Sequence, residues 1–185
     1  LVRWQHAEMG MVPPVQFIPA AEESGLIVPI DRWVMRTALQ QVGDWYRQGY
    51  TPGRLALNLA VKQLHQDDLI DMLESVLREA GCQPDWLALE ITESKIMTKP
   101  EHAIRVLQQV SELGVEIAMD DFGTGYSSLA YLSRLPLHRL KVDRTLVQAA
   151  TGDRLTARIV TAVVAMAREL NLEVTAEGIE TEAHR

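Results

Sequence analysis

Short apolar runs alternate along this chain with longer stretches in which apolar residues recur at helical spacing. The short runs have the length of strands buried on both faces of a sheet, and they cover residues 55–59, 86–91, 116–119, 139–142 and 173–176. The longer stretches cover residues 31–48, 67–80, 100–113 and 153–170. In the first of them, Val34, Ala38 and Trp45 fall on one side of a helix. Strand followed by helix, repeated several times, predicts a parallel sheet with helices packed outside it.

Glycine and proline support these helix boundaries. Gly49, Gly81 and Gly114 stand where a helix C-cap favours glycine, and Pro100 fits a first-turn position. No Pro-rich, Gly-rich or low-complexity linker interrupts the chain, so residues 1–185 are expected to belong to one domain. Two architectures stay open at this point: an open, doubly wound sheet, or part of a (β/α)8 barrel.

Polar side chains stand at the end of every predicted strand. In chain order they are Asn58, then Glu90 and Glu93, then Asp120 and Asp121, then Lys141 and Asp143, and finally Glu177. The carboxyl ends of parallel strands share one rim, and in a barrel the loops at that rim build the active site. An open sheet would spread these groups along an edge, whereas a barrel makes them converge. The pattern therefore favours a modified TIM (β/α)8 barrel of the α/β class.

Several carboxylates at one rim repel each other unless a counter-charge is present. A hard divalent cation such as Mg²⁺ or Mn²⁺ prefers oxygen ligands, and the adjacent pair Asp120-Asp121 could serve two such ions. Two ions can hold a phosphodiester, activate water and stabilise the leaving oxygen. Lys141 lies among these acids, where it could orient the attacking water or neutralise developing charge.

Each of these residues also has a purely structural interpretation. An acidic residue at a strand end is often the N-cap of the next helix, and Asp143 with Arg144 could form an ion pair at the rim. Gly123-Thr124-Gly125 alone is more often a turn than a phosphate-binding loop. A functional site is favoured because five separate strand ends behave alike.

Composition excludes several classes of protein. The formal charge of −7 and the lack of a basic stripe argue against a DNA-binding or other nucleic-acid-binding role. They do not exclude a phosphate-bearing ligand, because bound cations reverse the local charge. No apolar run approaches the roughly 20 residues that cross a bilayer, so no membrane contact is expected of this segment. Cys82, the single cysteine, cannot form an internal disulfide, which fits a reducing, cytoplasmic location.

The segment Asp120-Asp121-Phe122-Gly123-Thr124-Gly125-Tyr126-Ser127-Ser128-Leu129 resembles the highly specific loop of EAL domains. Further segments resemble the family in order and separation: Phe17-Ile18-Pro19, Asn58-Leu59, Glu90-Ile91-Thr92-Glu93-Ser94, Leu140-Lys141-Val142-Asp143-Arg144 and Glu177-Gly178-Ile179-Glu180-Thr181. The resemblance implies a modified barrel with one antiparallel strand. It also implies hydrolysis of the bacterial second messenger cyclic di-GMP to linear pGpG with two Mg²⁺ or Mn²⁺ ions.

The resemblance assigns a role to each matching position. The implied metal ligands are Asn58, Glu90, Asp120, Asp121 and Glu177. Lys141 would position or deprotonate the nucleophilic water, and Glu93 would hold the loop after Asp121. Leu1, Arg3 and Asp143 would lie on the substrate side, with Arg3 on a phosphate. A homodimer is implied as well, and so is a covalently linked sensor or GGDEF domain in a parent protein that could be anchored to the inner membrane.

The sequence departs from the family pattern at three places. Leu1 matches the leucine of the Glu-Ala-Leu motif, so the metal-binding glutamate is expected just before it. The family's last strand is not found after Thr181. A barrel incomplete at both ends, and an inactive fragment of an active parent domain, are therefore expected. Ala60 replaces a serine that many active members carry, for which we expect at most a modest effect.

Two other functions stay open from the sequence. A non-catalytic receptor would bind cyclic di-GMP and signal by a change of shape. A metal-dependent barrel lyase of the enolase type would use Lys141 as its base, since such enzymes also place carboxylates and lysines on successive strand ends.

Overall fold

The computed structural model describes residues 2–92, 96, 99–123 and 129–181. The chain divides into two compact units, each packed mainly within itself. The first unit comprises residues 1–55 and 59–83, and the second comprises residues 56–58 and 84–185. The second unit contains the sheet and most of the predicted site residues.

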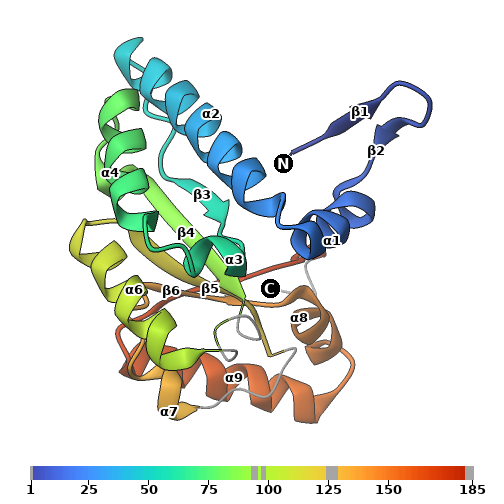
Figure 1. Cartoon of the computed structure of the whole chain (residues 1–185). Coiled ribbons are helices and arrows are strands. Elements are labelled where there is room, and N and C mark those ends of the chain that lie inside the picture. Colours follow the sequence, from blue (N-terminus) through green and yellow to red (C-terminus); the bar gives the residue numbers. More distant parts are fainter. Residues whose placement is uncertain (1, 93–95, 97–98, 124–128, 182–185) are drawn as a thin grey trace. The chain divides into compact units, whose positions relative to one another are not determined.

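The first unit combines an antiparallel hairpin with helices (Figure 1). Its elements are β1 (Trp4–His6), β2 (Gly10–Val12), α1 (Pro14–Ser24), α2 (Ile27–Arg47), α3 (Val61–Leu64) and α4 (Leu69–Ala80). The apolar stripe of α2 is buried at Met35, Leu39 and Val42. Gly43 allows α2 to pack closely on α4, because a Cβ there would lie 2.1 Å from the carbonyl oxygen of Ala80.

The second unit is a five-stranded sheet in the order β3-β4-β5-β6-β7. Its strands are β3 (Leu55–Asn58), β4 (Leu87–Thr92), β5 (Glu116–Phe122), β6 (Arg139–Val142) and β7 (Glu173–Ala176), and its helices are α6 (Pro100–Glu112), α7 (Leu129–Leu132), α8 (Arg144–Ala150) and α9 (Arg154–Glu169). A single 3₁₀ turn, Pro84–Trp86, precedes β4. The β4–β5, β5–β6 and β6–β7 pairs are all parallel. Figure 1 shows α9 running beside β7, against which it packs.

The central strands read as apolar runs because both of their faces are covered. Leu87 and Leu89 of β4 have no exposed surface, nor has Ile117 of β5, and Leu107 and Val110 of α6 are equally buried. A strand buried on both faces loses the alternation of polar and apolar residues. The parallel α/β class predicted from these runs is confirmed.

Element boundaries differ from the prediction where tertiary contacts decide them. All five predicted strands and four predicted helices are present, most of them within two residues of the expected ends. Strand β5 continues to Phe122 rather than ending at Met119, and α2 begins at Ile27 rather than Asp31. The hairpin, α3, α7 and α8 were not predicted, because their short lengths leave too few residues to show a period. Helix α1 (11 residues) was not predicted either, and it contains Pro19 in its interior, where proline normally argues against a helix. Within the described ranges, no helix is long and apolar enough to cross a membrane.

Candidate active site

Lys141 lies at the centre of the predicted site. Its Nζ atom is 2.9 Å from Oε1 of Glu90, 2.9 Å from Oδ1 of Asp120 and 2.8 Å from Oε1 of Glu177. The side chains of Lys141, Glu90 and Asp120 are only 13–14% exposed, whereas Glu177 is 34% exposed. We call these four residues the Lys141 cluster. Four neighbouring polypeptide segments thus deliver one cation and three carboxylates to one point, as the strand-end pattern predicts.

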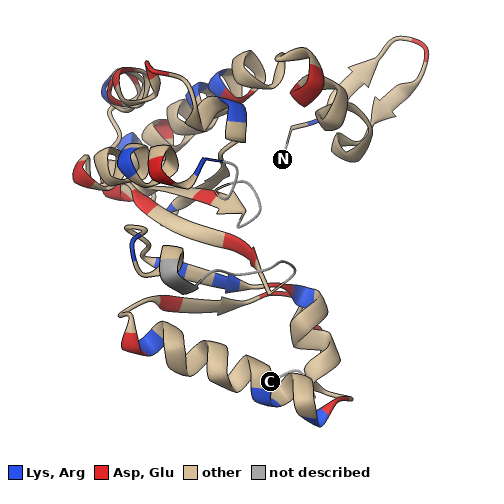
Figure 2. Ribbon diagram, turned by 60° about the horizontal axis from the view of Figure 1, so that its bottom comes forward, with Lys and Arg blue, Asp and Glu red and all other residues tan. Residues whose placement is uncertain are grey.

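Parallel strand register explains why the cluster forms. On β4 and β5, Thr92 lies opposite Asp120, and Glu90 stands two residues before Thr92, on the same face of β4. Lys141 on β6 lies opposite Thr175 of β7. The N–H of Glu177 donates to the carbonyl of Val142 over 3.0 Å, so the ladder continues past the last residue of β7. Figure 2 shows acidic positions gathered where the strands end, close to a basic position on a neighbouring strand.

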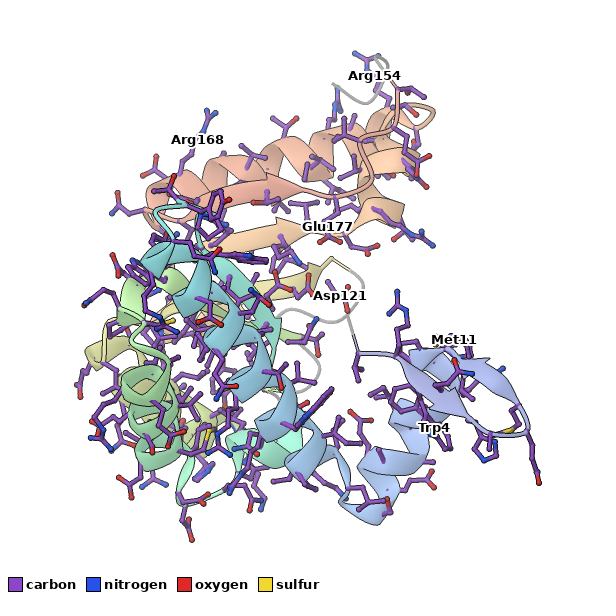
Figure 3. All side chains as sticks on the ribbon, turned by 90° about the horizontal axis from the view of Figure 1, so that it is seen from above. Trp4, Met11, Asp121, Arg154, Arg168 and Glu177 are labelled. Atoms are coloured by element: carbon purple, nitrogen blue, oxygen red, sulfur yellow. The ribbon has the colours of Figure 1, made fainter. Side chains whose placement is uncertain are left out.

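A bulge in β5 turns two consecutive aspartates toward the site. Successive residues of a regular strand point to opposite faces, but the β5–β6 register shifts between Met119 and Phe122. Asp121 takes a left-handed conformation with φ of 55°, which aspartate adopts more readily than most residues. The bulge therefore places the Asp121 carboxylate near the Lys141 cluster, and Figure 3 shows Asp121 and Glu177 near each other at the strand ends. Strained backbone of this kind concentrates at functional sites.

Electrostatics distinguish Asp121 from the acids that pair with Lys141. Burial raises the pKa of Asp121, and the charges of Asp120, Asp143 and Glu177 raise it further, although Lys141 lowers it. Burial opposes the charged form of Lys141, but hydrogen bonds to Asp120, Glu177 and Glu90 outweigh burial and raise the lysine pKa. Lys141 is thus held as an ammonium, and the site retains an excess of negative charge around Asp121.

A close backbone contact fixes Glu177. Gly178, the next residue, has φ of +71°, and a Cβ there would lie 2.6 Å from Cβ of Arg144 at the start of α8. Only glycine adopts this conformation at such a separation without displacing its neighbour. The approach of Gly178 to α8 therefore sets the position from which Glu177 reaches Lys141.

Asp143 has the structural role that strand-end acids often have. Its Oδ1 accepts a 2.8 Å hydrogen bond from the N–H of Thr145 and another from the Thr145 hydroxyl, so it is the N-cap of α8. The Thr145 hydroxyl lowers the pKa of Asp143. The Asp143 charge also contributes to the raised pKa of Asp121, which places it beside the site.

The remaining predicted site residues lie in different parts of the chain. Asn58 ends β3, the sheet neighbour of β4. Arg3 belongs to the first unit, where its guanidinium donates to the carbonyl of Val2 over 3.1 Å. Leu1 and Glu93 lie outside the residues that the structure describes.

The donors of this site suit a hard divalent cation. They are oxygen atoms, as Mg²⁺ and Mn²⁺ prefer, and four carboxylates, those of Glu90, Asp120, Asp121 and Glu177, lie around the single charge of Lys141. Oδ1 of Asp120 is buried, and its contact there is the 2.9 Å ion pair with the ammonium of Lys141. In the described part of the chain no three His, Cys, Asp or Glu side chains lie close enough together to form a metal-sized group, and the lysine ammonium contacts Glu90, Asp120 and Glu177.

Sequence reasoning missed two residues of interest, Thr92 in the second unit and Asp31 in the first. Thr92 shares a face of β4 with Glu90, and its buried hydroxyl has no hydrogen-bond partner within the described ranges. Its two-residue spacing from Glu90 was the available signal. Asp31 of α2 accepts a 2.8 Å hydrogen bond from the N–H of Ala60, two residues beyond Asn58. No local pattern reveals that contact, because the two residues lie far apart in the sequence.

Comparison with known proteins gives a consistent family match. The family described as EAL domain matches residues 1–185. The bifunctional diguanylate cyclase/cyclic di-GMP phosphodiesterase MucR of Pseudomonas aeruginosa is 43% identical over 185 residues, which are 100% of this chain and 27% of that protein. The cyclic di-GMP phosphodiesterase PdeR of Escherichia coli is 42% identical over 181 residues, which are 98% of this chain and 27% of that protein. The chain thus spans about a quarter of the length of these curated relatives.

Comparison with solved structures points to the same family. The PaMucR phosphodiesterase in complex with c-di-GMP has a TM-score of 0.92 and 43% identity, with 100% of this chain and 74% of that chain covered. The EAL enzyme Bd1971, in a form with cAMP and cyclic di-GMP bound, has a TM-score of 0.88 and 31% identity, with 98% of this chain and 50% of that chain covered. The barrel-type fold expected from the sequence agrees with these EAL structures.

Proposed function

Because this chain belongs to the EAL domain family, we propose that the protein containing it hydrolyses cyclic di-GMP to linear pGpG with the help of divalent cations. The observation that carries the proposal is the Lys141 cluster with Asp121 beside it. A receptor would need a surface for the dinucleotide but no such gathering of half-buried carboxylates. Phosphodiester hydrolysis needs that gathering, since the cations that assist it are held by oxygen ligands.

The metal ligands of the proposal are the residues at the strand ends. Asn58, Glu90, Asp120, Asp121 and Glu177 supply oxygen donors. Mg²⁺ or Mn²⁺ bound there would polarise the phosphodiester and lower the pKa of a water molecule. The family is metal-dependent in general, and the excess negative charge around Asp121 supports a cation at this rim.

Lys141 acts as a cation in this proposal. Its raised pKa keeps the ammonium protonated near neutral pH, which supports a donor and not a general base. From its position among Glu90, Asp120 and Glu177, the ammonium can donate to the attacking water or to a phosphate oxygen. Charge that develops on the phosphoryl oxygens is then neutralised by a group already in place.

The reaction balances as a hydrolysis. The oxygen of water forms a bond to phosphorus, and one P–O3′ bond of the cyclic dinucleotide breaks. A water proton goes to the released 3′ oxygen, leaving a 5′-phosphate and a 3′-hydroxyl on one linear product. Leu1, Arg3 and Asp143 are proposed for the substrate side, with Arg3 on a phosphate, and Glu93 for support of the loop after Asp121.

The proposal extends to partners. The curated relatives are much longer than this chain, and the name of one of them pairs a diguanylate cyclase with the phosphodiesterase. We propose a covalently linked GGDEF or sensor domain, a homodimer and a cytoplasmic location for the domain that contains this chain.

A paired measurement separates hydrolysis from mere recognition. The full-length protein is incubated with cyclic di-GMP and Mg²⁺ or Mn²⁺, and pGpG is followed by chromatography. Binding is measured in parallel by calorimetry with Ca²⁺ in place of these ions. Turnover with Mg²⁺ or Mn²⁺ supports the enzyme. Tight binding without pGpG from either metal contradicts it and leaves a receptor as the function.

A further inference from the structure

The turn that follows Asn58 is held by a helix distant in sequence. The N–H of Ala60 donates to Oδ2 of Asp31 on α2 over 2.8 Å. Ala60 is 7% exposed and Leu59 is 3% exposed, so the turn is buried as well as hydrogen-bonded. A buried backbone N–H left without an acceptor destabilises its conformation, which makes this contact a strong constraint on the turn.

The same turn lacks its own helix cap. Ala60 is the N-cap of α3, and its side chain makes no cap hydrogen bond. In a capping box, Ser or Thr at the N-cap is paired with Glu or Gln at the third helical position, whose side chain accepts from the N-cap N–H. Gln63 stands at that third position. Here the acceptor for the N-cap N–H comes from α2 instead, through Asp31.

Arg32 explains why Gln63 does not return to Ala60. The Nε atom of Arg32 donates to Oε1 of Gln63 over 3.3 Å, and a terminal nitrogen of Arg32 pairs with Asp68 at 2.5 Å. Gln63 has no exposed surface, so its orientation is fixed by this neighbour. Asp31 and Arg32, adjacent on α2, therefore contact the N-cap of α3 at Ala60 and its third residue, Gln63.

We propose that Asp31 is a positioning residue for Asn58 and thereby tunes the affinity of the site for divalent cations. The inference rests on the proposed function, in which Asn58 is a metal ligand. Asp31 fixes the backbone of Ala60, two residues from Asn58, and this limits the orientations available to the amide. Groups that orient metal ligands commonly change metal affinity by ~10- to 100-fold when removed. Asp31 acts through the backbone, so we expect ~3- to 10-fold.

The test measures Mn²⁺ binding to the full-length protein without substrate, from the electron paramagnetic resonance signal of free Mn²⁺. Asp31→Ala should weaken binding by ~3- to 10-fold, and Asp31→Asn should restore it, because the amide oxygen still accepts from Ala60. Asp44→Ala is the matched control, since Asp44 lies on the same helix and its pair with Arg47 is exposed. It should bind Mn²⁺ like the wild type.

A second variant tests the hydrogen-bond donor, which is the backbone N–H of Ala60. Ala60 has φ of −67°, which proline adopts, so Ala60→Pro removes the N–H while keeping the φ of this position. It should weaken Mn²⁺ binding like Asp31→Ala. In turnover assays, both should need more Mn²⁺ for half-maximal pGpG formation while reaching the wild-type rate at saturation.

The outcomes are distinguishable. Unchanged Mn²⁺ affinity in Asp31→Ala and Ala60→Pro, whatever their melting temperatures, overturns the positioning role. Failure of Asp31→Asn to restore affinity overturns the acceptor role of Asp31. A wild-type protein that neither binds Mn²⁺ nor forms pGpG contradicts the proposed function itself.

Discussion

Replacing Lys141 with methionine removes the cation from the centre of the Lys141 cluster. Methionine keeps most of the side-chain volume, so the change is chiefly electrostatic. Glu90, Asp120 and Glu177 would then face one another, with Asp121 close by, without this counter-charge. In the presence of a metal chelator, we expect the Lys141→Met variant to fold but to be clearly less stable than the wild type.

The contact distances set the size of the effect. At 2.8–2.9 Å and an effective dielectric constant of about 20, each attraction is worth roughly 6 kcal/mol before desolvation. Desolvation offsets most of this sum, and breaking a fully buried pair costs about 3–5 kcal/mol. The acids here are 13–34% exposed, so water screens part of the repulsion. We therefore expect a loss of about 2–4 kcal/mol.

Urea denaturation measures this loss, with Arg139→Met as the matched control. Arg139 lies two residues earlier on the same strand and pairs with Glu173 at 2.5 Å, but Glu173 is 69% exposed. An exposed pair contributes about 0–1 kcal/mol, so the control should lose no more than that. Equal losses in Lys141→Met and Arg139→Met would refute the idea that the Lys141 cluster is a buried, mutually dependent set.

The pH dependence has a definite sign. Without the ammonium, Asp121 loses the charge that lowers its raised pKa, so the folded state binds more protons than the unfolded one. The deficit of Lys141→Met is therefore largest near neutral pH and shrinks as pH falls. In the wild type the lysine pKa is raised, so its stabilisation is complete below the ordinary value of 10.5 and is lost only as pH rises through the higher folded-state pKa.

Three further predictions concern single positions. Gly178→Ala places a Cβ 2.6 Å from that of Arg144 in a left-handed conformation. It should lower the free energy of unfolding, measured by urea denaturation, by about 1–3 kcal/mol, and it should reduce the rate of pGpG formation. Wild-type stability together with a wild-type rate would contradict the close contact. Gly43→Ala places a Cβ 2.1 Å from the carbonyl oxygen of Ala80 and should lower stability by about 1–3 kcal/mol without a specific effect on metal affinity, as calorimetry would show. Asp153 accepts from a threonine hydroxyl and two backbone N–H groups at the start of α9, and these hydrogen bonds lower its pKa. The stability difference between wild type and Asp153→Ala should therefore be complete above the ordinary pKa of 3.8 and fade as pH falls through the lower folded-state value. A stability difference independent of pH would contradict this.

The strand ends show how much of the site could be predicted from sequence. Parallel strands with buried faces leave an apolar run that stops where a polar group reaches the rim, so Glu90, Lys141 and Glu177 could be placed at the same rim of one sheet. Their convergence followed from strand register alone. The direct contacts through Lys141 could not be predicted, because they depend on distances of a few ångströms between side chains from different strands.

The aspartate pair shows where sequence reasoning stops. The strand was expected to end at Met119, before Asp120 and Asp121, but β5 continues through both residues to Phe122, and a bulge turns Asp121. A bulge depends on pairing with the next strand and leaves no mark in the local pattern. The contact between Asp31 and Ala60 was hidden for a similar reason, since it joins two helices through one side chain.

Formation of pGpG by the wild type and by Asp120→Asn tests the central claim most directly. Asparagine keeps the shape of the side chain but removes the charge that faces Lys141 and, in the proposal, a metal ion. With Mn²⁺, cyclic di-GMP and equal amounts of folded protein, the wild type should form pGpG and the variant should be slower by at least ~100-fold, as for loss of a group that stabilises transition-state charge. Equal rates, or no product from the wild type with either Mg²⁺ or Mn²⁺, would contradict the assignment of this rim as the hydrolytic centre.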